Sequence, residues 1–395
     1  MAGGYRVIQP RVLFYVQHLL GIGHLARASR IATALADDGF DILVVTGGAP
    51  VAGFPAPGLK TLTLPPVVSG DEGFSGLTDL NGNPVDDAFK EKRRQMLLQT
   101  VDDFQPDIVI IEAFPFGRRQ MRFELIPLLE KVAALAPKPL LVASVRDILQ
   151  ERTKPGRNEE TVDLVENFFD LVMVHGDPSF ATIGQTFPLA RVIESKVAYT
   201  GLVAAPPPAV TSEHFDVLVS AGGGAAGGDL VASALAAAGM LAGNLKWCLI
   251  TGPNLPKPDF EAAVAGAPSN LTISRFRVDF ASLLTGCRLS VSQAGYNTVC
   301  DVLRARCRSL LVPFAAGGET EQTFRAERLE RMRLASVLTE RDLTPPALAQ
   351  AVERALTAAS PDTPALDLDG AKGSAKVLRK LLKSSNLTIK PSRSA

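Results

Sequence analysis

The stretch Ser292–Asp301 brings small residues, amides and a carboxylate to the point where a predicted strand gives way to a predicted helix. Ala294 and Gly295 allow a ligand to approach the backbone closely. The first amides of the helix, around Asn297–Val299, have no partner within a helix and lie at the positive end of its dipole, which suits a phosphate. Thr298 adds a hydroxyl, and Asp301 lies on the same helix face, where it can accept hydrogen bonds from a ribose. A tight turn with a charged first helical turn explains the pattern equally well.

A second polar group follows the predicted strand Ser309–Pro313. The loop after it carries Glu319, Glu321 and Gln322 close together in the chain. Carboxylates and amides bind pairs of hydroxyl groups through several directed hydrogen bonds, so this loop is suited to a sugar. The alternative is that these side chains cap the helix that follows.

Two glycine-containing turns lie at the ends of other strands. Gly21–Arg27 follows the first strand of the chain, and Ser220–Gly227 follows the first strand of its second half. Such turns leave backbone amides available to an oxyanion. For the second turn, flexibility between domains is an alternative that is compatible with binding.

Charged residues also leave two strands of the first half. Glu112–Arg119 contains one carboxylate, two phenylalanines and two arginines, and Arg146 follows a later strand beside Asp147. They suit an acceptor that carries sugars or phosphate. Phenylalanines in the core, solvated arginines and a buried Arg146–Asp147 ion pair are the alternative interpretation.

These motifs resemble the nucleotide-binding domain of the MurG-like peptidoglycan N-acetylglucosaminyltransferases and the related UDP-glycosyltransferases, over Ser220 to about Arg333. The resemblance implies that Gly295, Thr298 and Asp301 hold the donor diphosphate and ribose. It also implies that a later acidic-Gln pair, Glu321 and Gln322, contacts the sugar. Asp301 departs from the family, which usually has Glu at that position.

The resemblance extends to the first turn, whose histidine lies near the reacting sugar in these enzymes. An imidazole with an unperturbed pKa near 6.5 is suited to removing a proton from an acceptor hydroxyl. His24 is therefore the predicted general base, with Glu112 as the substitute. The predicted acceptor-side residues are Gly23, Arg27, Arg118 and Arg146. The predicted donor-binding residues are Gly222, Gly223, Gly224, Phe276, Arg277, Gln293, Gly295, Asn297, Thr298, Asp301, Glu319, Glu321 and Gln322.

The elements that must position these residues alternate between strands and helices. The first unit reads as strand Val12–Val16, helix Leu25–Asp37 and strand Asp41–Thr46, and the alternation restarts after the proline-rich segment Ala204–Thr211. We therefore predict an α/β protein with two Rossmann-like, doubly wound parallel sheets facing a central cleft, and the family resemblance implies that this is the GT-B architecture. The predicted domains are 1–205, onto which a C-terminal helix 371–385 packs back, and 206–370.

Composition limits the partners. The chain has 395 residues, 46% of them apolar, with 41 basic and 41 acidic side chains, so no net field favours nucleic acid. The four cysteines show no zinc spacing, and no apolar run is long enough for a signal peptide or a spanning helix. The protein is therefore predicted to be cytoplasmic. The tail from Lys372 carries seven basic and no acidic residues, which allows peripheral contact with the inner face of a membrane.

The predicted function is an inverting transfer of a hexosyl or N-acetylhexosaminyl group from a nucleotide diphosphate sugar, most simply a UDP-sugar. The acceptor is a hydroxyl of a saccharide, lipid-linked or small molecule, which suggests cell-surface polysaccharide or glycolipid synthesis. No cofactor or metal is predicted, because the Asp-x-Asp triplet Asp367–Asp369 lies away from any strand end. The alternatives are a UDP-sugar 2-epimerase of the same fold and a non-catalytic nucleotide-sugar-binding subunit.

Overall fold

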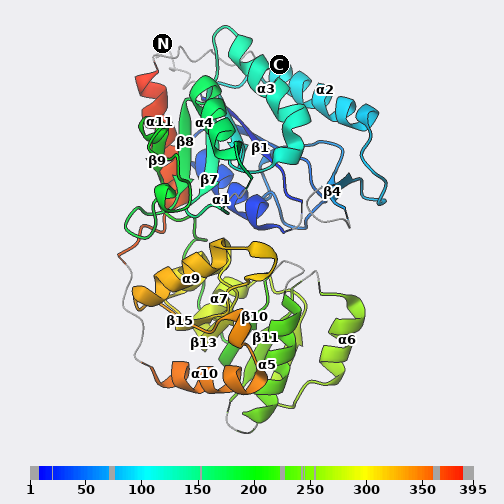
Figure 1. Ribbon diagram of the computed structural model, residues 1–395, viewed down its shortest axis with the longest axis vertical. Helices are drawn as coiled ribbons and strands as arrows, with labels where there is room; N and C mark the ends of the chain where they lie inside the picture. The colour runs from blue at the N-terminus through cyan, green and yellow to red at the C-terminus, as the bar shows by residue number, and fades with distance from the viewer. Residues whose placement is uncertain are drawn as a thin grey trace, which may run out of the picture. The chain divides into compact units, whose positions relative to one another are not determined.

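The chain forms two compact units, each built on a parallel sheet with helices on both faces (Figure 1). Unit 1 contains the chain up to Val203 and again from Asp369, and unit 2 is Ala204–Leu368. The predicted pair of doubly wound parallel sheets is confirmed. The computed structural model describes residues 9–19, 21–70, 76–151, 154–222, 227–241, 243, 245–252, 255–358 and 365–385.

Unit 1 has a seven-stranded parallel sheet in the order β3-β2-β1-β6-β7-β8-β9. The chain first winds from β1 toward β3 and then from β6 toward β9, so the winding reverses between β1 and β6. Loops at the carboxyl ends of the strands diverge at such a reversal, and ligands of doubly wound folds bind there. The strands are β1 Arg11–Val16, β2 Asp41–Thr46, β3 Lys60–Thr63, β6 Ile108–Glu112, β7 Leu140–Arg146, β8 Leu171–His175 and β9 Val197–Tyr199.

Both faces of this sheet are covered because its central strands are apolar on both sides. Alternate strand residues such as Leu13, Val109 and Leu141 join Leu97 and Leu125 from α2 and α3 in one core. The two remaining strands, β4 Val68–Ser69 and β5 Leu77–Thr78, form a small antiparallel hairpin. The helices of unit 1 are α1 Gly23–Asp37, α2 Asp87–Phe104, α3 Arg122–Ala134, α4 Arg157–Phe168 and α11 Gly370–Ser384.

The C-terminal helix α11 packs against α1, far from it in sequence. Arg379 donates to the Asp38 carboxylate at 2.8 Å and lies over the Phe40 ring at 4.2 Å. The start of α11 approaches the chain after β9 closely: a Cβ atom at Gly373 would lie 1.9 Å from the Thr200 carbonyl oxygen. A side chain at this position is therefore excluded.

Unit 2 has a six-stranded parallel sheet in the order β12-β11-β10-β13-β14-β15, which reverses between β10 and β13. Leu289 and Val291 on one face pack with α5 and α10, while Leu218 and Cys248 on the other pack with α7 and α8. The strands are β10 Phe215–Ser220, β11 Trp247–Ile250, β12 Leu271–Ser274, β13 Cys287–Ser292, β14 Ser309–Leu311 and β15 Ser336–Val337. The helices are α5 Gly228–Met240, α6 Lys257–Ala265, α7 Phe280–Gly286, α8 Tyr296–Ala305, α9 Glu321–Arg331 and α10 Pro345–Thr357.

Several elements were not predicted from the sequence. The edge strand β3 is largely exposed and β15 has only two residues, so neither gives an apolar run. Helix α10 carried a usable signal: Thr344 caps it by accepting from the Ala347 amide at 3.3 Å, and two prolines follow this cap. Helices α4, α6 and α7 were also missed.

The close approach of α11 gives a stability prediction. Gly373→Ala should lower the free energy of unfolding by about 1–3 kcal/mol, because the helix must move away from Thr200 to admit the methyl group. Gly239→Ala is the matched control: Gly239 is exposed in α5 with nothing within 4 Å of the added carbon, so stability should stay constant or rise. Urea unfolding measures both, and equal stability of the two variants would refute the close contact.

Candidate functional site

A buried carboxylate lies at the reversal point of unit 1. Glu112 is the last residue of β6 and has no exposed side-chain surface. His24 Nδ1 lies 2.9 Å from its Oε1, and Arg27 donates to the same oxygen. The hydroxyl of Ser144 on β7 donates to Oε2 at 2.6 Å. The predicted residues His24, Arg27 and Glu112 are thus brought together, whereas the contribution of Ser144 was not predicted.

The charges of this group fix the state of His24. Burial raises the pKa of Glu112, but the Arg27 charge and the His24 hydrogen bond outweigh burial and hold that pKa well below its usual range. Burial lowers the pKa of His24 well below 6.5, Arg118 lowers it further, and the hydrogen bond to Glu112 offsets only part of this. An ionised carboxylate only accepts, so neutral His24 carries its proton on Nδ1 and a lone pair on Nε2.

Nε2 of His24 has no hydrogen-bond partner among the residues that the structure describes, and the side chain is 15% exposed. This arrangement leaves a neutral imidazole able to take a proton, with an anion behind it to stabilise the imidazolium. Glu112 itself does not fit the role of substitute base, because it has no surface that could meet an acceptor hydroxyl.

Guanidinium groups gather around the same strand ends. Burial, together with the charges of Arg146 and Arg27, lowers the pKa of Arg118 to about 10, although the charge of Glu112 offsets part of this effect. The terminal nitrogens of Arg118 have no partner in the described part of the chain; its Nε donates to the Gln17 carbonyl at 2.7 Å. Positive charge therefore exceeds negative charge here, as an anion-binding site requires.

The two phenylalanines of the Glu112–Arg119 segment belong to the core. Phe114 and Phe116 are buried, and Phe116 packs edge-on against Phe187 with ring centroids 5.2 Å apart. The interpretation in which these two rings contact an acceptor is therefore wrong, and the alternative of phenylalanines in the core is confirmed. Arg119 pairs with Glu160, which leaves Arg118 to carry the predicted acceptor-side charge.

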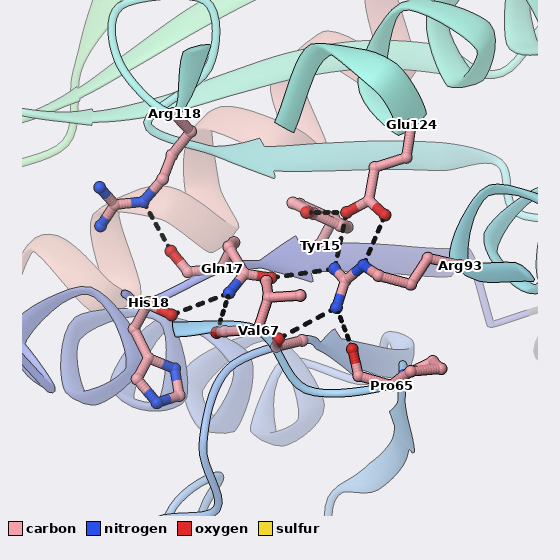
Figure 2. A network of polar contacts seen from close by, with 9 residues as sticks. Tyr15, Gln17, His18, Pro65, Val67, Arg93, Arg118 and Glu124 are labelled. Carbon is pink, nitrogen blue, oxygen red and sulfur yellow. Dashed lines mark hydrogen bonds and ion pairs between the residues drawn. The ribbon is translucent and has the colours of Figure 1, made fainter. Parts of the chain in front are cut away.

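A second buried ion pair supports the segment that holds Arg118 (Figure 2). Arg93 pairs with Glu124 through two hydrogen bonds of 2.8 and 2.7 Å, and neither side chain is exposed. Its other donors reach the Gln17 amide oxygen at 3.0 Å and the carbonyls of Gly47 and Pro65. The side chain of Gln17 is thus fixed by Arg93, and the backbone carbonyl of Gln17 accepts from Arg118.

The corresponding point of unit 2 has glycines and helix ends in place of buried charge. Gly222 follows β10 with φ +81°, and a Cβ atom there would lie 3.0 Å from Gln293 Oε1 in the turn after β13. The two predicted donor turns therefore meet. Gly223 and Gly224 lie outside the described residues.

The start of α8 differs slightly from the prediction. The helix begins at Tyr296, and the Val299 amide already donates to the Gly295 carbonyl at 3.0 Å, so the first-turn amides that precede the intrahelical hydrogen bonds are those of residues 296–298 and not 297–299. Asn297 and Thr298 are partly exposed. The Asp301 carboxylate is mostly buried and accepts from the Ala205 amide at 3.4 Å, so its predicted ribose contact remains a prediction.

The predicted sugar-binding residues each have a structural partner. Glu319 accepts from the Glu321 amide at 2.6 Å, as a cap of α9 does. Glu321 is buried and pairs at 2.8 Å with Arg325, which also donates to the Ala294 carbonyl of the donor turn. The Gln322 amide oxygen accepts from the Phe314 amide at 3.2 Å. Helix α9 is thereby fixed to the donor turn.

Phe276 and Arg277, which the family resemblance predicts to bind the nucleobase of the donor, follow β12. Arg277 is bound by two carboxylates, at 2.5 Å from Glu213 and 2.7 Å from Asp279, so its side chain has a structural role. Phe276 is 53% exposed. Contact with a base through the backbone of this segment stays a prediction.

Within the described ranges, no three His, Cys, Asp or Glu side chains group closely enough to hold a metal ion. No helix in this part of the chain combines the length and apolar character needed to span a bilayer.

Comparison with known proteins places these features in context. Residues 217–376 match the model of the glycosyltransferase family 28 C-terminal domain. Two curated relatives are UDP-N-acetylglucosamine--N-acetylmuramyl-(pentapeptide) pyrophosphoryl-undecaprenol N-acetylglucosamine transferases of Xanthomonas campestris pv. campestris. The one from strain 8004 is 34% identical over 126 residues, which is 32% of this chain and 29% of that protein. The one from strain B100 is 37% identical over 114 residues, 29% of this chain and 26% of that protein. The match thus spans less than a third of these relatives.

Solved structures are similar over almost the whole chain. The calicheamicin glycosyltransferase CalG4 has a TM-score of 0.59 and 19% identity, covering 95% of both chains. MurG of Acinetobacter baumannii has a TM-score of 0.56 and 16% identity, covering 95% of this chain and 99% of that one. The predicted GT-B fold and the predicted resemblance to MurG-like proteins are both confirmed.

The depressed histidine pKa values predict how stability depends on pH. Burial, with the Arg27 charge, lowers the pKa of His175 on β8 to about 3, and that of His24 is also low. Unfolded histidines take up protons near pH 6.5 that the folded chain does not, so stability should fall as pH drops below about 6.5. Each of these two histidines contributes up to about 1.4 kcal/mol per pH unit to this fall in the free energy of unfolding.

His175→Gln should flatten this slope by about 1 kcal/mol per pH unit on average between pH 6.5 and 5, a window mostly above the range in which carboxylates titrate. Urea unfolding followed by circular dichroism at several pH values measures it. A slope identical to that of the unmodified chain would show that His175 is protonated in the folded state.

Proposed function

We propose that this chain is an inverting, metal-independent glycosyltransferase that uses a nucleotide diphosphate sugar as donor and a hydroxyl group as acceptor. The observation that carries the proposal is the meeting of the Gly222 and Gln293 turns at the reversal point of unit 2, beside the start of α8. This unit contains most of the segment that matches the glycosyltransferase family 28 C-terminal domain. The curated relatives use a UDP-sugar, so UDP-N-acetylhexosamine or UDP-hexose is the proposed donor.

In unit 2 the diphosphate would lie against backbone amides. The start of α8 directs the positive end of its helix dipole and the Thr298 hydroxyl toward this point, and Gly222 lets the opposite turn approach closely. Preorganised amides at a helix start stabilise the negative charge that develops on a departing diphosphate. This stabilisation needs no metal ion.

In unit 1 the base would be His24. Its Nε2 takes the proton of the acceptor hydroxyl while the acceptor oxygen forms a bond to the anomeric carbon. The bond from that carbon to the diphosphate oxygen breaks, and its electron pair leaves with the nucleoside diphosphate. One displacement inverts the anomeric centre. Glu112, 2.9 Å from Nδ1, stabilises the imidazolium that results.

The arginines of unit 1 favour an acceptor with a negative group. Arg118 presents terminal nitrogens that no described residue engages, and the nearby positive charges of Arg146 and Arg27 make an anion favourable there. A phosphate-bearing or lipid-linked saccharide has this chemistry, and the curated relatives are named for a pyrophosphoryl-undecaprenol acceptor. Synthesis of a cell-surface polysaccharide or glycolipid is the corresponding role.

The location proposed is the cytoplasm, with peripheral contact at the inner face of the membrane. Four lysines, Lys372, Lys376, Lys380 and Lys383, are exposed along α11, and none of that helix's residues is acidic. Such a row of charges is attracted to anionic lipid.

The epimerase alternative receives less support. It requires acid and base carboxylates beside the sugar ring, yet Glu112 is enclosed by donors, Glu319 caps α9 and Glu321 pairs with Arg325. A neutral histidine with a carboxylate behind it fits deprotonation of a hydroxyl better.

The proposed base gives a kinetic prediction. His24→Ala should lower kcat by about 10²- to 10⁴-fold, the usual contribution of a positioned base, while leaving the Kd of the UDP-sugar unchanged. Initial-rate assays and calorimetry measure the two quantities. His214→Ala, an exposed histidine of unit 2, is the matched control and should keep full activity. Normal turnover in the His24 variant would exclude it as the base.

The donor turn gives a binding prediction. A UDP-sugar at 100 times its Kd should stabilise the chain by about 2.7 kcal/mol and raise its melting temperature. Gly222→Ala should abolish the rise, because a side chain strains the backbone at φ +81° and lies 3.0 Å from Gln293 Oε1. Gly53→Ala, at φ +80° with nothing within 4 Å, carries the same backbone strain and should keep the ligand response. A chain that responds to no diphosphate sugar would contradict the proposed donor.

A further inference from the structure

Behind Glu112, a line of buried polar side chains crosses three neighbouring strand ends, and the proposed chemistry does not use it. The Ser144 hydroxyl on β7 lies 2.8 Å from His175 Nε2 at the end of β8. His175 Nδ1 lies 2.9 Å from the hydroxyl of Thr200, just after β9. All three side chains are buried, two of them with no exposed surface. Polar groups buried in this way are costly unless each has a partner.

The direction of every hydrogen bond in this line follows from the charge on Glu112. The ionised carboxylate only accepts, so the Ser144 hydroxyl donates to Oε2 at 2.6 Å. Ser144 must then accept from His175, which places the proton on Nε2 and a lone pair on Nδ1. Thr200 donates to that lone pair, since its other acceptors, the carbonyls of Gly201 and Val174, lie farther away at 3.2 and 3.5 Å.

We propose that Ser144 and His175 are positioning residues that hold the Glu112 carboxylate in the orientation in which it fixes His24 as a base. This inference rests on the proposed function, because it assigns them an effect on the same reaction. Neither residue contacts the acceptor: both are fully buried behind the carboxylate.

The two carboxylate oxygens of Glu112 bind different donors. Oε1 takes the contacts from His24 and Arg27, whereas Oε2 takes the Ser144 hydroxyl. Without Ser144, Oε2 would be buried with no donor, and the carboxylate could turn to share Arg27 between both oxygens. His24 would then lose the acceptor that keeps the proton on Nδ1 and the lone pair on Nε2.

Burial and charge together keep His175 neutral. Burial lowers the pKa of His175 most, the charge of Arg27 lowers it further, and Glu112, the negative group that faces His175, offsets only part of this. Arg118 faces His24, and Arg146 faces Arg118. His175 is therefore kept neutral, as a residue that must both donate and accept has to be.

Helix α11 holds the far end of the line. The Thr200 carbonyl lies so close to Gly373 that α11 fixes this residue, and Gly370 approaches the Gly201 carbonyl in the same way. A segment from the C-terminal end of the chain thus supports the hydroxyl that completes the line.

The first test reads the tautomers directly and needs no substrate. The chain has four histidines, so ¹⁵N-histidine labelling with long-range ¹H–¹⁵N spectra at pH 7 can assign each ring through single substitutions. The inference predicts the Nε2–H tautomer for His175 and the Nδ1–H tautomer for His24. If His175 is instead the Nδ1–H tautomer or is protonated, the hydrogen bonds cannot run in the proposed directions, and the inference fails. Because turnover is not involved, this result is independent of whether the chain transfers sugars.

The second test separates positioning from folding. Ser144→Ala should lower kcat about tenfold, leave the KM of the donor unchanged and mix the His24 tautomers. Ser290→Ala is the matched control, since Ser290 is a fully buried strand serine of unit 2 whose hydroxyl has no partner among the described residues; its kcat should be unchanged.

His175→Gln keeps an amide donor for Ser144 and should retain kcat within about threefold, whereas His175→Leu should match Ser144→Ala. If Ser144→Ala loses stability but keeps kcat and a single His24 tautomer, these residues are structural only and the inference fails. If all variants and the unmodified chain lack transferase activity while the predicted tautomers are observed, the proposed function fails and the hydrogen-bond line stands.

Discussion

One constraint governs the site of unit 1: a carboxylate placed at a strand end with no access to water must be neutralised by the side chains around it. Glu112 meets this constraint through three donors from two elements, His24 and Arg27 on α1 and Ser144 on β7. Removal of Arg27 would leave the buried charge uncompensated, which costs several kcal/mol, and removal of either neutral donor would leave a buried acceptor unsatisfied. The contact with Glu112 fixes the tautomer of His24, whereas burial and the Arg118 charge keep its pKa low. Packing and chemistry at this point are thus consequences of one buried charge.

The two units place different chemical groups at the point where the winding of each sheet reverses. Unit 1 gathers ionised groups, with an excess of arginine, and stabilises them with a second buried ion pair between Arg93 and Glu124. Unit 2 uses neutral backbone at Gly222 and at the start of α8. Charges in unit 1 suit recognition of an anionic acceptor and transfer of a proton. Amides in unit 2 suit a diphosphate whose charge increases as it leaves.

Local sequence predicted much of this arrangement and missed what depends on tertiary contacts. The apolar strand runs and the glycine turns were sufficient for two doubly wound sheets, because both signals are local. The pairing of His24 with Glu112 joins residues 88 apart in sequence, and the sequence indicated each of them separately as a candidate base. The contact of Ser144 with His175 was beyond reach, because it depends on strand register: β6 pairs Glu112 with Ser144, and His175 lies two residues past Met173, the partner of Ser144 on β8. The capping role of Glu319 was foreseen as an alternative to sugar binding.

The most direct test of the central claim is hydrogen–deuterium exchange of the unmodified chain with and without UDP, read by mass spectrometry. UDP should slow exchange in the peptides that contain residues 293–299 and Gly222, since it would bind the amides where these two turns meet. Peptides from α10, on one face of the same sheet, serve as the internal reference and should be unchanged. Unaltered exchange in both turns at saturating UDP, or protection confined to other segments, would contradict a nucleotide-sugar site at the reversal point of unit 2.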